Sequence, residues 1–215
     1  MRINKNYLLI GLILASFYLY LGYKDLVSNR HIQASPAVAN KVLTSSKTNV
    51  KKFGELRANI AIAEFKKNVV ETPRGCNCGP EIDKYTESSP GQWCAMFASW
   101  VANEAGNPLV NPRTDSWKIT NSRAFTDYLK QKGTFYSREQ IIKDNIQPQI
   151  GDYVVFYRGN YEDNLGHIDI VVNSNSSDGK ADLIGGNYRD SVNYRKDFPY
   201  MDSYGFLGFG RPEKK

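Results

Sequence analysis

Two residues of this chain have side chains that together could perform nucleophilic chemistry on an amide: Cys94 and His167. Cys94 follows a Pro-Gly turn and begins an apolar series with helical spacing, which Gly106 ends. The free N–H groups in the first turn of a helix stabilise an anion, so this position favours a thiolate. The alternative is a structural cysteine, because free cysteine is among the most buried residue types.

His167 is placed to act as the base for such a thiolate. It lies in the segment Gly166–Val172, whose alternation predicts a strand with His167 and Asp169 on one face and aliphatic residues on the other. Thiol attack on an amide needs a nearby base and a group that orients the base. The other histidine, His31, lies in an N-terminal segment without sustained periodicity. His167 is therefore the candidate base, with a satisfied structural histidine as the alternative.

The positive charge of the chain is concentrated at its N-terminus. Residues 1–52 hold 8 Lys/Arg and 1 Asp/Glu, whereas residues 53–215 hold 20 Lys/Arg and 21 Asp/Glu. The second part is thus almost neutral, which weighs against a nucleic-acid-binding domain. A basic arm beside an apolar segment suits an anionic membrane surface or cell wall.

The N-terminal segment predicts a membrane anchor. The run from Tyr7 to Tyr23 has 17 uncharged residues, which is short for a transmembrane helix and long for a signal-peptide core. We expect residues 1–23 to be a single anchor with its short end inside and the rest of the chain exported, with a cleaved signal as the alternative. Residues 24–52 are expected to form a flexible basic tether.

Residues 53–215 predict one α+β domain. An amphipathic stripe predicts a helix from Phe53 to about Val70, and a second helix is expected over 122–132 with a short turn after Ser137. From Ile150 the period changes to two. The expected strands are Tyr153–Tyr157, His167–Asn173, Ala181–Gly186, Ser191–Arg195 and Phe206–Phe209. Helices followed by antiparallel strands indicate N-terminal helices packed on a small antiparallel sheet.

The remaining cysteines form the motif Cys76-Asn77-Cys78. A zinc site needs four ligands, and the scarcity of histidine makes such a set hard to complete here. We therefore expect no metal and no cofactor. A local disulfide and two free thiols both remain open for Cys76 and Cys78.

Five motifs in order give the chain a resemblance to a known family. These are Asn77-x-Gly79-Pro80, Trp93-Cys94-Ala95-x-Phe97-x-Ser99-Trp100-Val101, Gly151-Asp152-x-Val154-Val155-Phe156, Gly166-His167-x-x-Ile170-Val171 and Gly186-Asn187. Together they resemble the CHAP family, the papain-like cysteine amidases and peptidases related to the NlpC/P60 enzymes. The similarity spans roughly residues 53–212, and it implies a papain-like fold.

The resemblance also implies roles for particular residues. Cys94 would be the nucleophile, His167 the general base, and Asn187 the residue that orients the imidazole. Many relatives carry a glutamate where this chain has Gly185, and they usually carry glycine where it has Asp169. Asp169 could replace that acid, but same-face neighbours on a strand are about 6.6 Å apart, so we rank Asn187 ahead of it.

The oxyanion donors expected for such a site are the backbone N–H of Cys94 and the side chain of Gln92. The resemblance implies a hydrolase of peptidoglycan that cleaves an amide bond, at the muramoyl–alanine linkage or within the stem peptide or cross-bridge. We expect a monomeric catalytic domain outside the cytoplasm, held at the bacterial membrane or secreted after cleavage. The alternatives are a protease acting on proteins and an inactive CHAP-like scaffold of an envelope assembly, for which Gly185 would be a sign.

Overall fold

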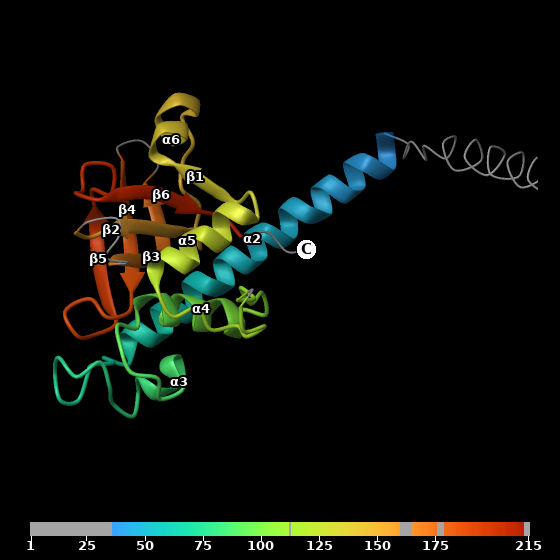
Figure 1. The fold of residues 1–215 in the computed structure, drawn as a ribbon. Coiled ribbons are helices and arrows are strands. Elements are labelled where there is room, and N and C mark those ends of the chain that lie inside the picture. The colour runs from blue at the N-terminus through green and yellow to red at the C-terminus, as the bar shows by residue number, and fades with distance from the viewer. Residues whose placement is uncertain (1–35, 112, 160–164, 176–178, 213–215) are drawn as a thin grey trace, which may run out of the picture. The chain divides into compact units, whose positions relative to one another are not determined.

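The computed structural model describes residues 36–111, 113–159, 165–175 and 179–212. Helices come first, and most strands follow (Figure 1). The helices are α2 (Pro36–Lys66), α3 (Asp83–Thr86), α4 (Cys94–Glu104), α5 (Ser122–Gln131) and α6 (Arg138–Asp144). The strands are β1 (Phe135–Ser137), β2 (Tyr153–Tyr157), β3 (Gly166–Asn175), β4 (Lys180–Gly185), β5 (Asn193–Phe198) and β6 (Phe206–Gly210). The expected α+β class is confirmed.

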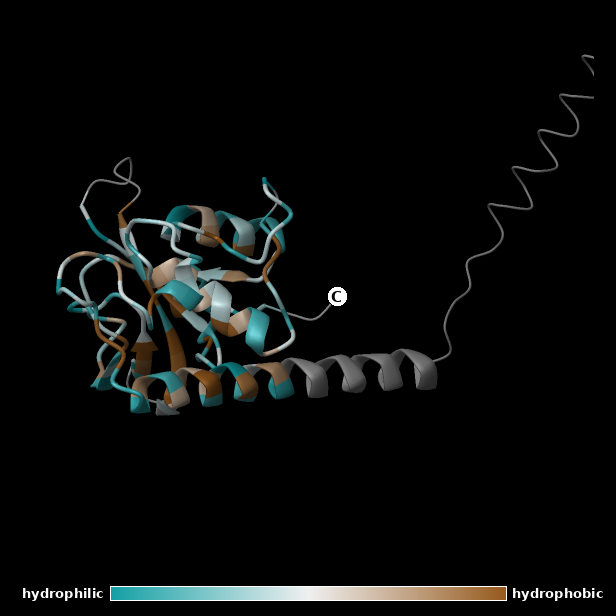
Figure 2. Ribbon diagram, turned by 90° about the horizontal axis from the view of Figure 1, so that it is seen from below, coloured by the Kyte–Doolittle hydropathy of each residue, from teal (hydrophilic) through white to brown (hydrophobic). Residues whose placement is uncertain are grey.

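The strands form one antiparallel sheet in the order β1-β6-β2-β3-β4-β5. One face packs against α4 and α5 through a core that includes Phe97, Phe125 and Ile168. The other face holds a second core that includes Ile141 of α6 and Val171. Figure 2 shows the strong apolar colouring of central strands between these layers. The predicted alternation of β3 is therefore confirmed, with its isoleucines on the helix side and Val171 on the other.

The helix α2 begins earlier than the sequence predicted. Residues 36–52 belong to this helix, so the expectation of a flexible tether is wrong for that stretch. Pro36 suits the first turn of a helix, and residues 37–53 contain neither proline nor glycine. Once the packed part of a helix has formed, extending it by a residue is inexpensive compared with nucleation. At the other end α2 stops at Lys66, and Val70 instead pairs with Ser191 in an isolated bridge.

The predicted membrane anchor, residues 1–23, lies outside the described residues. Residues 24–35 of the predicted tether also lie outside them. By contacts the chain divides into residues 1–43 and 44–215. Within the described part of the chain, a search for a helix of membrane-spanning length and hydropathy finds none. The anchor and the tether up to residue 35 therefore stay predictions.

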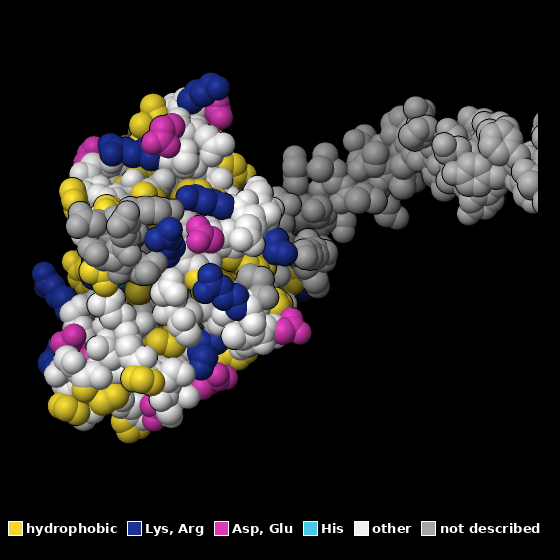
Figure 3. Space-filling view, in the orientation of Figure 1, with side chains coloured by type: hydrophobic (Ala, Val, Ile, Leu, Met, Phe, Trp, Pro, Cys, Tyr) yellow, Lys and Arg dark blue, Asp and Glu magenta, His cyan; other side chains and the backbone are white. Residues whose placement is uncertain are grey.

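Charged side chains of both signs are interspersed on the face seen in Figure 3. Neither lysine and arginine nor aspartate and glutamate gather into one large patch on this face. This distribution fits the near-neutral balance of residues 53–215. A nucleic-acid-binding surface would instead show a basic stripe.

Helix α2 approaches the sheet closely at Gly54 and Arg57. A Cβ atom at position 54 would overlap the carbonyl oxygen of Ile150. The buried Arg57 donates from Nε to the Gly151 carbonyl at 2.9 Å, and its guanidinium lies 5.4 Å from the centre of the Tyr153 ring. The helix is thus joined to the start of β2 by a backbone contact that a side chain at position 54 would disrupt.

Replacing Gly54 with alanine should lower the stability of the fold. Alanine is favoured over glycine in a helix by about 1 kcal/mol, but the overlap with the Ile150 carbonyl oxygen should outweigh this gain and leave a net loss of about 1–3 kcal/mol. Urea unfolding followed by circular dichroism measures the difference. The exposed Asn59→Ala in the same helix is the control and should be neutral or stabilising. A Gly54→Ala protein more stable than the wild type would contradict the close packing.

Candidate active site

Cys94 is the first residue of α4, and its side chain is buried, with 5 % exposure. The thiol donates to the carbonyl oxygen of Gly166 at 3.8 Å. The backbone N–H of Ala95 also points to the sulfur, as expected in the first turn of a helix. The predicted position of Cys94 at a helix start is confirmed, and the sulfur lies beside the beginning of β3.

His167 is the second residue of β3 and only 1 % exposed. Its imidazole lies close enough to the Cys94 thiol for the two groups to shift each other's pKa. The nucleophile and base predicted from the sequence are therefore brought together by α4 and β3. Such a pair is the minimum required for a thiol to attack an amide.

Asp169 contacts the imidazole of His167, which in turn lies beside Cys94. The Nε2 atom of His167 lies 3.1 Å from Oδ1 of Asp169, and the other carboxylate oxygen forms an ion pair with Arg195. Asp169 is 1 % exposed, so its charge is kept out of water. We ranked Asn187 ahead of Asp169 as the residue that orients the imidazole. In the structure Asp169 contacts the imidazole, so this ranking is wrong for the contact itself. The spacing of 6.6 Å refers to backbone positions, whereas strand side chains lean along the strand and can meet.

Gly185 on the neighbouring strand leaves the space that this carboxylate occupies. A Cβ atom at position 185 would overlap Oδ1 of Asp169. The two departures from the family pattern, an acid at 169 and a glycine at 185, are thus coupled across β3 and β4. A carboxylate reaches the imidazole from β3 in this chain.

The surroundings of the Cys94–His167 pair favour a reactive thiol. Burial raises the pKa of Cys94, but the hydrogen bond and charge of His167, with help from Ala95 N–H and Arg158, hold the pKa below its ordinary value. Burial lowers the pKa of His167, the contact with Cys94 opposes this, and Arg158 and Arg195 lower it further. The imidazole is therefore neutral at neutral pH and can accept the proton of the thiol.

Asn187 supports the nucleophile helix instead of the imidazole. Its side-chain amide is joined to that of Asn77 by a hydrogen bond of 2.8 Å. In the opposite orientation of the Asn187 amide, which replaces this bond, its oxygen accepts from the backbone N–H of Trp93 at 3.0 Å and its nitrogen donates to Glu71 at 3.2 Å. In that orientation the Asn187 oxygen lies 2.8 Å from Oδ1 of Asn77, so a hydrogen bond between the two amides requires the Asn77 amide to turn as well. Asn187 therefore fixes the residue directly before Cys94.

Glu71 is a buried carboxylate at the centre of the same network. Its Oε1 accepts from the Trp93 indole at 2.8 Å, and its Oε2 accepts from the Asn77 backbone N–H at 2.8 Å. Sequence reasoning missed Glu71 because no local pattern links it to a helix that starts 23 residues later. The signal available in the sequence was the position of Glu71 shortly before the Cys-x-Cys motif.

Cys76 and Cys78 form a disulfide, which settles the question left open by their motif. The bond closes the loop that carries Asn77, whose backbone has a left-handed φ of 52°. Cys94 is then the free cysteine of the described residues. No group of three or more His, Cys, Asp or Glu side chains in this part of the chain is arranged to hold a metal ion.

The oxyanion donors are only partly defined by the fold. The N–H of Cys94 lies in the first turn of α4, where helix N–H groups lack intrahelical acceptors. Gln92 is exposed in the loop that precedes Trp93. The backbone donor is in place, and the role of the Gln92 side chain stays a prediction.

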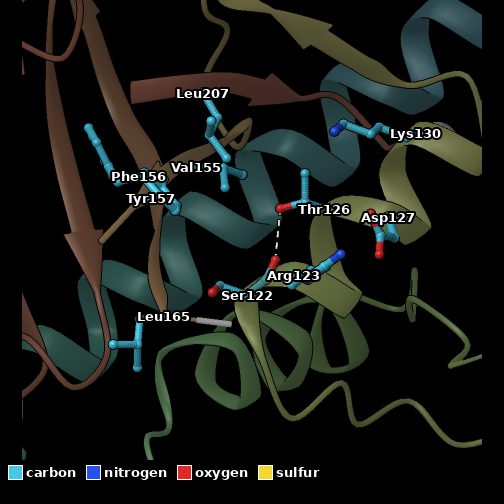
Figure 4. A pocket seen from close by; sticks show the side chains of 10 residues that line it. All are labelled: Ser122, Arg123, Thr126, Asp127, Lys130, Val155, Phe156, Tyr157, Leu165 and Leu207. Carbon is cyan, nitrogen blue, oxygen red and sulfur yellow. Dashed lines mark hydrogen bonds between the residues drawn. The ribbon is translucent and has the colours of Figure 1, made fainter. Parts of the chain in front are cut away.

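Two pockets border this site. The smaller, of about 30 Å³, lies between α5 and β2 next to Leu165 (Figure 4). Ser122 lines it and lies against Gly166, whose carbonyl accepts from Cys94. The larger, of about 250 Å³, is lined by His167 itself. A volume of about 30 Å³ has room for a water molecule only, so the larger pocket is the one able to hold part of a substrate.

Comparison with known families agrees with this geometry. Residues 84–187 match the family model of the CHAP domain, a shorter segment than the 53–212 expected from the motifs. Neither a curated protein nor a solved structure matches the chain. The CHAP domain implies a cysteine-dependent amidase or peptidase acting on peptidoglycan. The matched segment contains Cys94, His167 and Asp169, and the chain carries a CHAP domain at residues 84–187, a domain that suggests an amidohydrolase.

Proposed function

We propose that this chain is a membrane-tethered, papain-like peptidoglycan hydrolase in which Cys94 attacks an amide bond. The observation that carries the proposal is the grouping of three buried side chains: Cys94 lies beside His167, and Nε2 of His167 lies 3.1 Å from the Asp169 carboxylate. Nucleophile, base and orienting group are the three parts that acyl transfer by a thiol requires. The predicted anchor at residues 1–23 would hold the enzyme next to the wall.

The contacts indicate how a proton would move. Because Nε2 of His167 faces the Asp169 carboxylate, it carries the hydrogen, and Nδ1 is left to face the thiol. Nδ1 takes the thiol proton as the sulfur attacks the carbonyl carbon, and the Cys94 N–H stabilises the oxyanion. The imidazolium then gives its proton to the leaving amine, and a thioester forms. Water, activated by the neutral imidazole, hydrolyses the thioester and restores Cys94.

The scissile bond is an amide of peptidoglycan, either the muramoyl–alanine linkage or a bond of the stem peptide or cross-bridge. An inactive scaffold remains the other candidate only if the acid of the site has been lost. Gly185 suggested such a loss, but Asp169 occupies the place of the missing carboxylate. That contact supports an enzyme over a scaffold.

Purified chain should release soluble fragments from isolated peptidoglycan, and Cys94→Ala should abolish the release. Chromatography with mass spectrometry of the fragments would identify the new ends, since the amidase reaction yields a free lactyl carboxylate and endopeptidase cleavage yields a new peptide amine. Equal release by the wild type and Cys94→Ala would show a contaminant. No release by a folded wild type would count against the proposal.

A swap of two residues tests the orienting role of Asp169. Asp169→Gly should lower kcat/KM by about 100- to 10,000-fold, as for other orienting carboxylates. Gly185→Glu alone should also impair the enzyme, because its side chain meets Asp169. The double variant Asp169→Gly/Gly185→Glu should recover at least about tenfold over Asp169→Gly, because the carboxylate then comes from β4. Additive losses in the double variant would contradict the coupling.

The comparison with Asn187 separates orientation of the base from support of the helix. Asp169→Asn should reduce kcat far more than Asn187→Ala, since only Asp169 contacts the imidazole. Asn187→Ala should lose about 1–3 kcal/mol of stability, the cost of leaving buried polar groups unpaired. Kinetic assays and thermal unfolding of both variants measure the two effects. A greater kcat loss in a folded Asn187→Ala would show that the sequence ranking was right after all.

The pH dependence should reflect the lowered pKa of His167. A base stays active until it is protonated, so the acidic limb of kcat/KM should lie below pH 6.5, the ordinary value of histidine. Iodoacetamide should alkylate Cys94 below the ordinary thiol pKa of about 8.5, and the Cys76–Cys78 disulfide removes competing thiols without reductant. His167→Ala should move alkylation to higher pH. A wild-type midpoint at or above the ordinary thiol value would mean an unactivated, structural thiol.

A further inference from the structure

A pocket of about 250 Å³ lies against the buried imidazole of His167. Its walls come from β2 and β5 and from the segment between β5 and β6. The lining residues are Phe156, Tyr157, Arg158, Gly159, His167, Arg195, Phe198, Ser203 and Tyr204. A substrate whose amide reaches Cys94 must place a neighbouring group near His167. This pocket is therefore the place for that group.

Two arginines line the pocket, and among the described residues Arg195 alone of the two forms an ion pair. Arg195 forms an ion pair with Asp169, and its guanidinium lies 3.9 Å from the centre of the Phe198 ring. Arg158 follows the last residue of β2 and is exposed. Among the described residues no acidic side chain forms an ion pair with Arg158. Within the part of the chain that the structure describes, Arg158 thus presents a positive charge without an acidic partner beside Cys94 and His167.

Four of the other lining residues are phenylalanine or tyrosine: Phe156, Tyr157, Phe198 and Tyr204. Phe156 and Phe198 meet edge to face at 5.8 Å, and Tyr204 is 85 % exposed. Tyr204 therefore offers a ring at the rim of the pocket that a bound group can contact. Apolar walls also exclude water and strengthen the attraction between a guanidinium and an anion. A carboxylate on a short aliphatic stem fits both features.

We propose that this pocket binds a free carboxylate of the peptide part of the substrate, with Arg158 as its partner. The proposal rests on the proposed function, because it places the carboxylate on the peptide whose amide Cys94 attacks. Arginine presents paired N–H donors that match the two oxygens of a carboxylate. Acidic residues with such free groups occur in the peptides of peptidoglycan, and amidation of these groups would weaken recognition.

Binding of the full chain with Cys94→Ala to isolated peptidoglycan tests the proposal without turnover. The probe is peptidoglycan freed of phosphodiester-linked polymers with hydrofluoric acid, used as such or after its carboxylates are converted to amides with carbodiimide and ammonium. Sedimentation should show about tenfold weaker binding to the amidated form. Adding Arg158→Gln should weaken binding to the native form by about tenfold and cause no further loss on the amidated form. Arg138→Gln, exposed on α6 outside this pocket, is the matched control and should cause no loss on either form.

Kinetics distinguish a binding role from an effect on the thiol. Arg158→Gln in the otherwise unchanged chain should raise KM for native peptidoglycan about tenfold and change kcat by a smaller factor, because Arg158 also lowers the pKa of both Cys94 and His167. A fall in kcat with unchanged KM would show that Arg158 acts on the Cys94–His167 pair and not on a ligand, and this would overturn the proposal. Equal losses for Arg158→Gln on native and amidated peptidoglycan would overturn it as well. If turnover fails but sedimentation still discriminates the two forms, the proposed hydrolysis falls while the carboxylate site stands.

Discussion

The buried charge of Asp169 is the constraint on which the catalytic geometry depends. Taking a carboxylate out of water costs several kcal/mol unless opposite charge and hydrogen bonds compensate it. Arg195 supplies the charge, His167 supplies the hydrogen bond, and Gly185 leaves the room. These residues come from three strands that are adjacent in the sheet, β3, β4 and β5. The order of the strands therefore determines where the imidazole can point.

The nucleophile is held by a separate polar network. Glu71 and Asn187 bind the side chain and backbone of Trp93, which fixes the start of α4 and with it Cys94. Asn77 joins both residues, and its loop is closed by the Cys76–Cys78 disulfide. A thiol and a base must be held within about 0.5 Å of productive geometry. Two rigid networks, one for each partner, meet that requirement without a direct covalent link between α4 and β3.

The sequence predicted the elements that local periodicity specifies. Cys94 at a helix start, His167 on a strand and the range Tyr153–Tyr157 follow from spacing alone, and the structure agrees. The three-residue strand β1 was missed because it is too short to show a period. Asp169 was ranked too low because the room for its carboxylate is left by Gly185 on the neighbouring strand β4, which the spacing within β3 does not reveal. Glu71 and Arg195 were missed for the same reason: their partners are distant in sequence and are chosen by tertiary packing.

The buried Asp169–Arg195 pair also bears on whether the domain is an enzyme. Replacing a buried ion pair with well-packed apolar residues is often neutral or stabilising, so stability alone gives little reason for such a pair. Here Asp169 contacts Nε2 of His167, and the same imidazole lies beside the Cys94 thiol. A scaffold needs neither the neutral imidazole nor the lowered pKa of Cys94. The cost of burying these charges is understandable if the arrangement serves proton transfer between Cys94 and His167, and this favours catalysis over a scaffold role.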